Sequence, residues 1–194
     1  MMSKFLVSCL FAALVLPPTL LAGPLGQEEP RLRDEAPDDP ERNRRFVGVL
    51  ASAVRHELMT LPYYNVFDWL EAEVSEDGRV VLEGWVVDGA TRRDAEARME
   101  SIESVTEVVN NIEVLPPSPA DDALRTAIYR AVFDFNSPLF RYATRAVPPI
   151  HIIVDNGRVT LKGVVASEAD RQIAYTAARS VPGTFGVENE LVVE

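Results

Sequence analysis

The chain has 194 residues, with 30 acidic against 19 basic side chains and a formal net charge of −11. This excess of acid disfavours nucleic acid as a partner, because phosphate binding requires clustered lysine and arginine. The single cysteine, Cys9, lies near the N-terminus, so the rest of the chain can form neither a disulfide nor a thiolate metal site. Packing alone must hold the folded part together.

Residues 1–22 have the features of an export signal. Lys4 supplies a positive charge, an uncharged apolar run extends from Phe5 to Ala22, and small residues follow. The run also approaches the ~20 residues that span a bilayer. Two fates stay open, removal as a signal peptide and retention as an anchor, and both predict export from the cytoplasm.

Residues 23–42 are rich in proline and charged residues and contain almost nothing to bury. This composition is typical of a disordered spacer. We expect the folded part to begin near Arg44.

The folded part contains an internal repeat. The stretch "EDGRVVLEGWV" (Glu76–Val86) recurs as "DNGRVTLKGVV" (Asp155–Val165), and from there the two halves align without a gap to the end of the chain. The repeat predicts one domain over residues 43–115 and a second over residues 121–194, joined by a linker at 116–120. At roughly 75 residues a domain buries only about 60% of the surface that its unfolded chain exposes, so each copy is expected to be marginal alone.

Each copy begins with a predicted helix and a predicted hairpin. Apolar residues recur every four positions within residues 44–58 and 121–134, which indicates amphipathic helices. Two strands then flank the dipeptides Asp77-Gly78 and Asn156-Gly157, which tolerate positive φ at both turn centres. Each copy is therefore predicted to begin with a helix that is followed by a tight hairpin.

A second helix and a last strand complete each copy. Asp88 and Ser167 are candidate N-caps, and alternating apolar residues from Val108 and from Val187 predict the strand. The buried helix positions are expected to be Ala95, Met99 and Ile102 in one copy, and Ile173, Ala174, Ala177 and Val181 in the other. The fold class is α+β, with two tandem α-β-β-α-β units.

Alternation also predicts which side of each sheet the helices cover. Val80, Leu82 and Val86 share one face, and Val159, Leu161 and Val165 are their equivalents. Trp85 lies on the opposite face. It either packs against the other copy or the linker, or contacts a partner.

This pattern resembles the BON domain. In both copies a helix is followed by "V.nG.V.L.G.V", a second helix and "V..V.N.l.V", with the family positions at Gly78, Gly84, Asn110, Gly157, Gly163 and Asn189. The resemblance implies a small mixed three-stranded sheet under two helices, no catalysis, a periplasmic location and a role in envelope integrity and stress tolerance. It also implies binding to phospholipid or envelope proteins.

The family positions have structural explanations that need no ligand. Gly78 and Gly157 suit the turns, while Gly84 and Gly163 permit a bulge or the close approach of a helix. Asn110 and Asn189 can satisfy backbone groups at the start of the last strand.

No catalytic constellation is present in the sequence. His56 and His151, the two histidines, occupy unrelated positions in the two copies, and no nucleophile motif adjoins either. Glycine-rich phosphate loops, metal-ligand spacings and cofactor fingerprints are missing as well. The sequence therefore predicts a protein that is not an enzyme and has no cofactor, metal or small-molecule substrate.

The copies diverge between the first helix and the first strand. Residues 60–70 and 134–149 are both rich in aromatic side chains. Their surroundings differ in charge, because residues 43–115 contain 7 basic against 14 acidic residues, and residues 119–194 contain 8 against 9. By this count only the second copy tolerates an anionic surface.

In the second copy, cations and aromatic residues occur together. The candidates are Arg125, Arg130, Phe140, Arg141, Tyr142 and Arg145. An apolar wedge among cations suits anionic lipid headgroups. Alternatively, the aromatic residues complete a small core and the arginines pair with Asp134 and neighbouring acids.

Two functional hypotheses follow. In the first, the second copy binds anionic phospholipid at a membrane surface. In the second, the protein is a soluble, chaperone-like scaffold that holds envelope proteins on its open sheet faces and its acidic first copy.

Overall fold

The computed structural model describes residues 39–145 and 147–194. The predicted export signal and most of the predicted spacer lie outside the described residues. The first copy comprises α1 (Pro40–Met59), β1 (Trp69–Val74), β2 (Arg79–Val86), α2 (Gly89–Glu100) and β3 (Glu107–Val114). The second comprises α3 (Pro119–Val132), the 3₁₀ helix η1 (Pro138–Tyr142), β4 (Ile150–Asp155), β5 (Arg158–Val165), α4 (Glu168–Arg179) and β6 (Gly186–Val193).

Each copy forms a mixed three-stranded sheet, in the orders β1-β2-β3 and β4-β5-β6. The first two strands of each sheet pair antiparallel, and the last strand pairs parallel with the middle one. A parallel pair needs a crossover, which α2 and α4 provide. The α+β class and the mixed sheet are confirmed.

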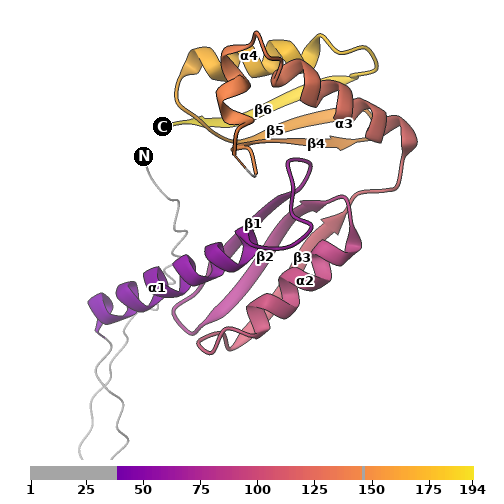
Figure 1. Ribbon diagram of the computed structural model, residues 1–194. Helices are drawn as coiled ribbons and strands as arrows, with labels where there is room; N and C mark the ends of the chain where they lie inside the picture. Colours follow the sequence, from indigo (N-terminus) through magenta and orange to yellow (C-terminus); the bar gives the residue numbers. More distant parts are fainter. Residues whose placement is uncertain (1–38, 146) are drawn as a thin grey trace, which may run out of the picture. The chain divides into compact units, whose positions relative to one another are not determined.

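Both helices of each copy cover the same face of its sheet (Figure 1). The middle strands point their predicted residues into that layer, where Val80, Leu82, Val86, Val159, Leu161 and Val165 are all buried. Helix α2 buries Thr91, Ala95 and Met99, and α4 buries Asp170, Ala174 and Ala178. Four other predicted positions are only partly buried and border the cores, namely Ile102, Ile173, Ala177 and Val181. In the second copy α4 turns Ala174 and Ala178 inward instead.

The helix starts follow capping side chains. Asp88 and Ser167 are N-caps as predicted, and their side chains accept the backbone N–H of Ala90 and Asp170. Helix α1 begins at Pro40, earlier than expected, because Asp39 caps it. Ser118 caps α3.

Asp121, near the start of α3, also binds the turn between β4 and β5. Its carboxylate is buried and accepts the backbone N–H of Asn156 at 3.0 Å and of Gly157 at 2.9 Å. It therefore ties α3 to the turn between β4 and β5.

The two hairpin turns differ, contrary to the sequence prediction. In the second copy Asn156 and Gly157 have φ values of 49° and 75°, as the dipeptide predicts. In the first copy only Gly78 has positive φ, at 84°, and Ser75 N–H bonds to the carbonyl of Arg79 at 3.0 Å to close a longer loop.

Gly84 and Gly163 are required by close backbone packing. Their φ values are 129° and 119°, and a Cβ atom would lie 1.9 Å from the carbonyl oxygen of Trp69 or of Pro149. The close neighbour is thus the backbone at the start of the adjacent strand, so the close approach of a helix, one of the two predicted reasons for these glycines, is wrong.

Asn110 and Asn189 bridge the last strand to the preceding helix. Their amides donate to the carbonyl oxygens of Arg92 at 3.1 Å and Arg171 at 3.0 Å. Their side-chain oxygens accept the N–H of the residue two positions on. The predicted role of satisfying backbone groups is confirmed.

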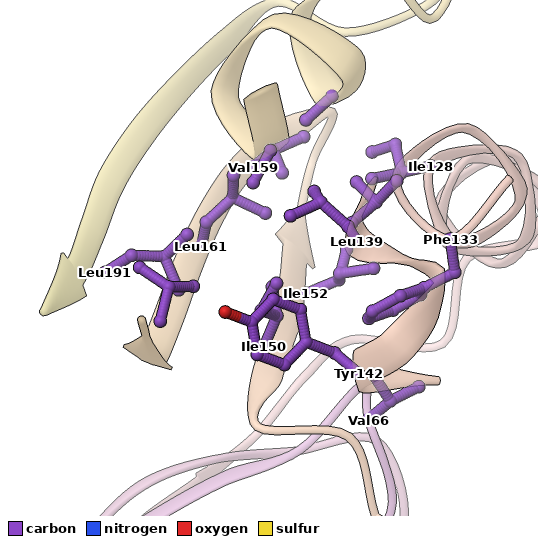
Figure 2. Close-up of a cluster of buried hydrophobic side chains, with 14 of the residues drawn as sticks. Val66, Ile128, Phe133, Leu139, Tyr142, Ile150, Ile152, Val159, Leu161 and Leu191 are labelled. Atoms are coloured by element: carbon purple, nitrogen blue, oxygen red, sulfur yellow. The ribbon is translucent and has the colours of Figure 1, made fainter. Parts of the chain in front are cut away.

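The two copies have separate cores that are completed in different ways. Helix α1 supplies Leu58 to the first core, and Leu61 follows it. The shorter α3 is followed by η1, which supplies Leu139 and Tyr142 to the second core (Figure 2). That core also takes Val66 from the first copy.

Candidate functional site

The segment after α3 carries the predicted lipid-binding residues. Ser137 accepts the N–H of Leu139 at 3.2 Å and so starts η1, with Pro138 as its first residue. Leu139 and Tyr142 are buried and anchor this short helix on the second core. With three residues per turn, the positions between these anchors face outward, which presents Phe140 and Arg141.

Two phenylalanines stand out from this segment. Phe135 is 78% exposed and Phe140 is 38% exposed, and their rings meet edge to face with centroids 5.1 Å apart. Phe135 was absent from the predicted set of site residues. The sequence "DFNSPLF" contains both rings, but only the position of η1 shows that they meet.

Three arginines flank the pair in the sequence. Arg130 and Arg145 are exposed and make no ion pair with any residue that the structure describes. The Arg141 side chain is 55% exposed, although its guanidinium is bonded to Asp170 and lies 3.2 Å from the Tyr142 hydroxyl. We call Arg130, Phe135, Phe140, Arg141 and Arg145 the aromatic–arginine surface.

Two other predicted residues are interior. Arg125 is buried, and its guanidinium donates to the carbonyl oxygen of Val154 at 2.6 Å and to Asp122 at 2.5 Å. The Tyr142 hydroxyl donates to Asp170 at 3.0 Å and accepts the N–H of Ala166 at 2.9 Å. Both side chains are engaged inside the second copy, so we leave them out of the surface.

Trp85 is half-buried on the helix-free face of the first sheet. Its ring centroid lies 5.4 Å from Nζ of Lys162, which belongs to β5 of the second copy. Lys162 also pairs with Glu190 at 2.8 Å and with Glu71 of the first copy at 3.7 Å. These contacts support the interpretation that Trp85 packs against the other copy.

The described residues 39–145 and 147–194 contain no cluster of three or more side chains that could hold a metal. In this same part of the chain, no helix combines the length and the apolar character needed to cross a bilayer. His56 is exposed on α1, whereas His151 is buried on β4.

The structure defines a protein with two tandem copies of one small α+β domain. The BON domain model matches residues 67–116 and 121–194, so the chain belongs to the BON domain family. Domains of this family are non-catalytic binding domains, and membership indicates an envelope-associated protein.

Comparisons with curated proteins and with solved structures give no information about function. No curated protein matches the chain. Two solved structures of CdsD, a structural protein of the type III secretion system of Chlamydia trachomatis, are similar to it. The first, a C-terminal domain, is 13% identical, with a TM-score of 0.29 over 75% of this chain and 97% of that one. The second is 11% identical, with a TM-score of 0.30 over 75% and 92%. Scores this low carry no argument about function.

Proposed function

We propose that this protein is a non-catalytic envelope protein that binds anionic phospholipid through the aromatic–arginine surface of its second copy. The observation that carries the proposal is the exposed, contacting pair of Phe135 and Phe140, with the exposed Arg130, Arg141 and Arg145 all within five residues of a ring in the sequence. We further propose that residues 1–22 direct the protein to the periplasm, and that lipid binding supports envelope integrity under stress.

The chemistry of the surface suits a lipid headgroup region. Exposed phenylalanine rings enter the boundary between headgroups and acyl chains, and guanidinium groups meet the phosphates. Each well-placed cation contributes about 1 kcal/mol at an anionic surface. Three arginines and two rings therefore give weak, reversible binding that falls as salt screens the charges.

The charge difference between the copies supports the same assignment. Residues 43–115 carry twice as many acidic as basic residues, 14 against 7, whereas the second copy is nearly balanced. An anionic membrane therefore repels the first copy and leaves the second as the side that approaches.

Vesicle flotation tests the proposal. At low salt the protein is expected to float with vesicles that contain phosphatidylglycerol and not with phosphatidylcholine alone. Arg130→Glu with Arg145→Glu should abolish flotation, because it replaces two positive charges by two negative ones at the proposed lipid-binding surface. Neither arginine has an ion-pair partner among the described residues, so the fold should be unaffected. Wild-type protein that stays with the soluble fraction would refute lipid binding.

Matched variants separate the site from net charge. Arg92→Glu with Arg93→Glu makes the same charge change on exposed positions of α2 and should leave flotation intact. Phe135→Ser with Phe140→Ser should weaken binding, while Phe185→Ser, which alters a ring that is 84% exposed elsewhere, should not. Equal losses in site and control variants would show that binding depends on bulk charge or hydrophobicity.

A further inference from the structure

The segment that joins α1 to β1 lies against the second copy. We call residues 61–68 the strap. The carbonyl oxygen of Val66 accepts the N–H of Ile152 in β4 at 2.8 Å, and the Val66 side chain is buried in the second core. The ring of Phe67 meets Tyr129 of α3 edge to face, with centroids 6.2 Å apart. The strap is thus a part of the first copy that completes the second.

His151 sits at the centre of this contact. It is 6% exposed, and its Nδ1 atom lies 2.6 Å from the carbonyl oxygen of Asp68. Its ring centroid lies 5.5 Å from that of Tyr64 and 5.1 Å from that of Trp69. Because a carbonyl oxygen only accepts, Nδ1 is the donor, which one neutral tautomer of imidazole satisfies.

We propose that the strap and β4 form an acid-sensitive joint, in which protonation of His151 releases residues 61–68 from β4. The neutral ring fits between two aromatic rings with one N–H donated. A second proton places a positive charge in a site from which water is excluded, and this costs free energy unless the site opens.

The charged groups around His151 do not remove this cost. Lys162 is its cross-strand partner on β5, and its ammonium disfavours a second cation. Glu71 lies on β1, but it is exposed and shares Lys162 with Glu190. Burial lowers the pKa of His151, and the hydrogen bonds to the backbone of Asp68 and of Asn65 offset only part of that effect.

Two further titratable groups on the strap face the joint. Burial raises the pKa of the Tyr64 hydroxyl, which therefore stays protonated throughout the acid range. Burial also raises the pKa of Asp68, whose carboxylate accepts the N–H groups of Val87 and Asn65. Protonation of Asp68 acts in the opposite sense and stabilises the docked strap, so a variant that removes only the imidazole is needed to separate the two.

The sign of the effect follows from linkage. The released ring has its ordinary pKa of 6.5, and the docked ring has a lower one. The released state therefore binds more protons, so docking is strongest above pH 6.5 and weakens as the pH falls below it. At pH 5.0, which is 1.5 pH units below the ordinary pKa, the equilibrium constant for docking can fall by at most about 30-fold.

Hydrogen exchange at the Ile152 amide tests the proposal, because that N–H is bonded to the strap. Its protection factor, corrected for intrinsic exchange, is expected to fall between pH 7.5 and 5.0, by at most about 30-fold. His151→Phe keeps an aromatic ring near Tyr64 and Trp69 and should abolish this fall, so that any remaining change with pH comes from Asp68 and is a rise in protection as the pH decreases. His56→Gln removes the other histidine, which is exposed, and should behave like the wild type.

Two outcomes would refute the acid-sensitive joint. One is a wild-type protection factor at Ile152 that does not change with pH, and the other is a protection factor in His151→Phe that falls with pH as it does in the wild type. Should His151→Phe fail to fold, titration of the wild-type imidazole by NMR decides. A His151 pKa at or above that of exposed His56 contradicts the proposal, and a lower one supports it. These measurements contain no lipid, so they are independent of the proposed function.

Discussion

Strands β1 and β4 occupy the same place in the two copies, yet their outer faces have opposite chemistry. Leu70 pairs with Gly84 and Ile150 pairs with Gly163, which makes Glu71 the equivalent of His151 and Glu73 the equivalent of Ile153. The two glutamates are exposed, whereas His151 and Ile153 are buried.

The difference follows from what each strand lies against. In β4 one face packs under α3 and η1, and the strap and Trp69 cover His151 on the other. In β1 the helix-free face keeps acids in water, and Glu71 there forms an ion pair with Lys162. The comparison shows that the copies remain alike where the backbone demands it and differ where one copy contacts the other.

The glycines test the part that the copies share. Gly84→Ala and Gly163→Ala should each destabilise their own copy by about 3 kcal/mol or more, since φ above 100° is nearly restricted to glycine and the new Cβ would meet a carbonyl oxygen. Urea unfolding followed separately in each copy by hydrogen exchange measures the loss. Gly48→Ala in α1, where nothing lies within 4 Å, should instead stabilise by about 0.5–1 kcal/mol. Very unequal losses at Gly84 and Gly163 would mean that the two hairpins are not equivalent.

Exchanging the outer-face residues tests the part that differs. Ile153→Glu should cost about 3 kcal/mol, because it removes a buried side chain and buries a charge. Glu73→Ile, at the equivalent exposed position, should change the free energy of unfolding by less than about 0.5 kcal/mol. Chemical denaturation of the two variants checks this. Similar costs in both would show that the outer face of β4 is not covered in solution.

Local sequence signals predicted most of the fold. The capping residues Asp88 and Ser167, the alternation in β2 and β5, and the turn at Asn156-Gly157 each depend on a few neighbouring residues, and all were confirmed. The strap was not predictable, because it joins residues 83 positions apart, such as Asp68 and His151, and follows no periodic pattern. The run of apolar residues in "IHIIV" was the available signal that both faces of this strand are covered.

The surface was predictable only in part for a similar reason. Charge and aromatic content located the segment, but side-chain direction decided which residues face outward. Arg125 lies on the buried side of α3 and Tyr142 points into the core, whereas Phe135 completes an exposed ring pair. In the segment around η1 a single 3₁₀ turn sets these directions, and such turns leave no periodicity in the sequence. Arg125 differs, because it lies on α3 next to Leu124 and one turn before Ile128, so the helical period was the available signal.

Shortening the strap's anchor gives a smaller effect. Val66→Ala should destabilise the second copy by about 1–2 kcal/mol, because it removes two buried methyl groups from a core to which the first copy contributes. The hydrogen-exchange protection of the Ile152 amide should fall by more than that of amides in the first core. Val49→Ala, at a position that is 73% exposed on α1, is the control and should be close to neutral. Undiminished protection at Ile152 in Val66→Ala would mean that the strap does not support β4.

The smallest expected effect is at Lys162, the cation shared between the copies. Its side chain is 13% exposed, but Glu71 and Glu190 are about half exposed, at 55% and 48%. Water therefore screens both pairs, and Lys162→Met, which removes the ammonium but keeps an unbranched side chain, should cost less than about 1 kcal/mol. Thermal unfolding at 20 mM and 500 mM salt distinguishes the causes. If the charge matters, the difference between wild type and Lys162→Met shrinks at high salt, and Glu71→Gln reproduces it. A difference that does not depend on salt would mean that the lysine acts through the contacts of its ammonium with the rings of Trp69 and Trp85, at 5.7 Å and 5.4 Å from the ring centroids, and not through the two glutamates.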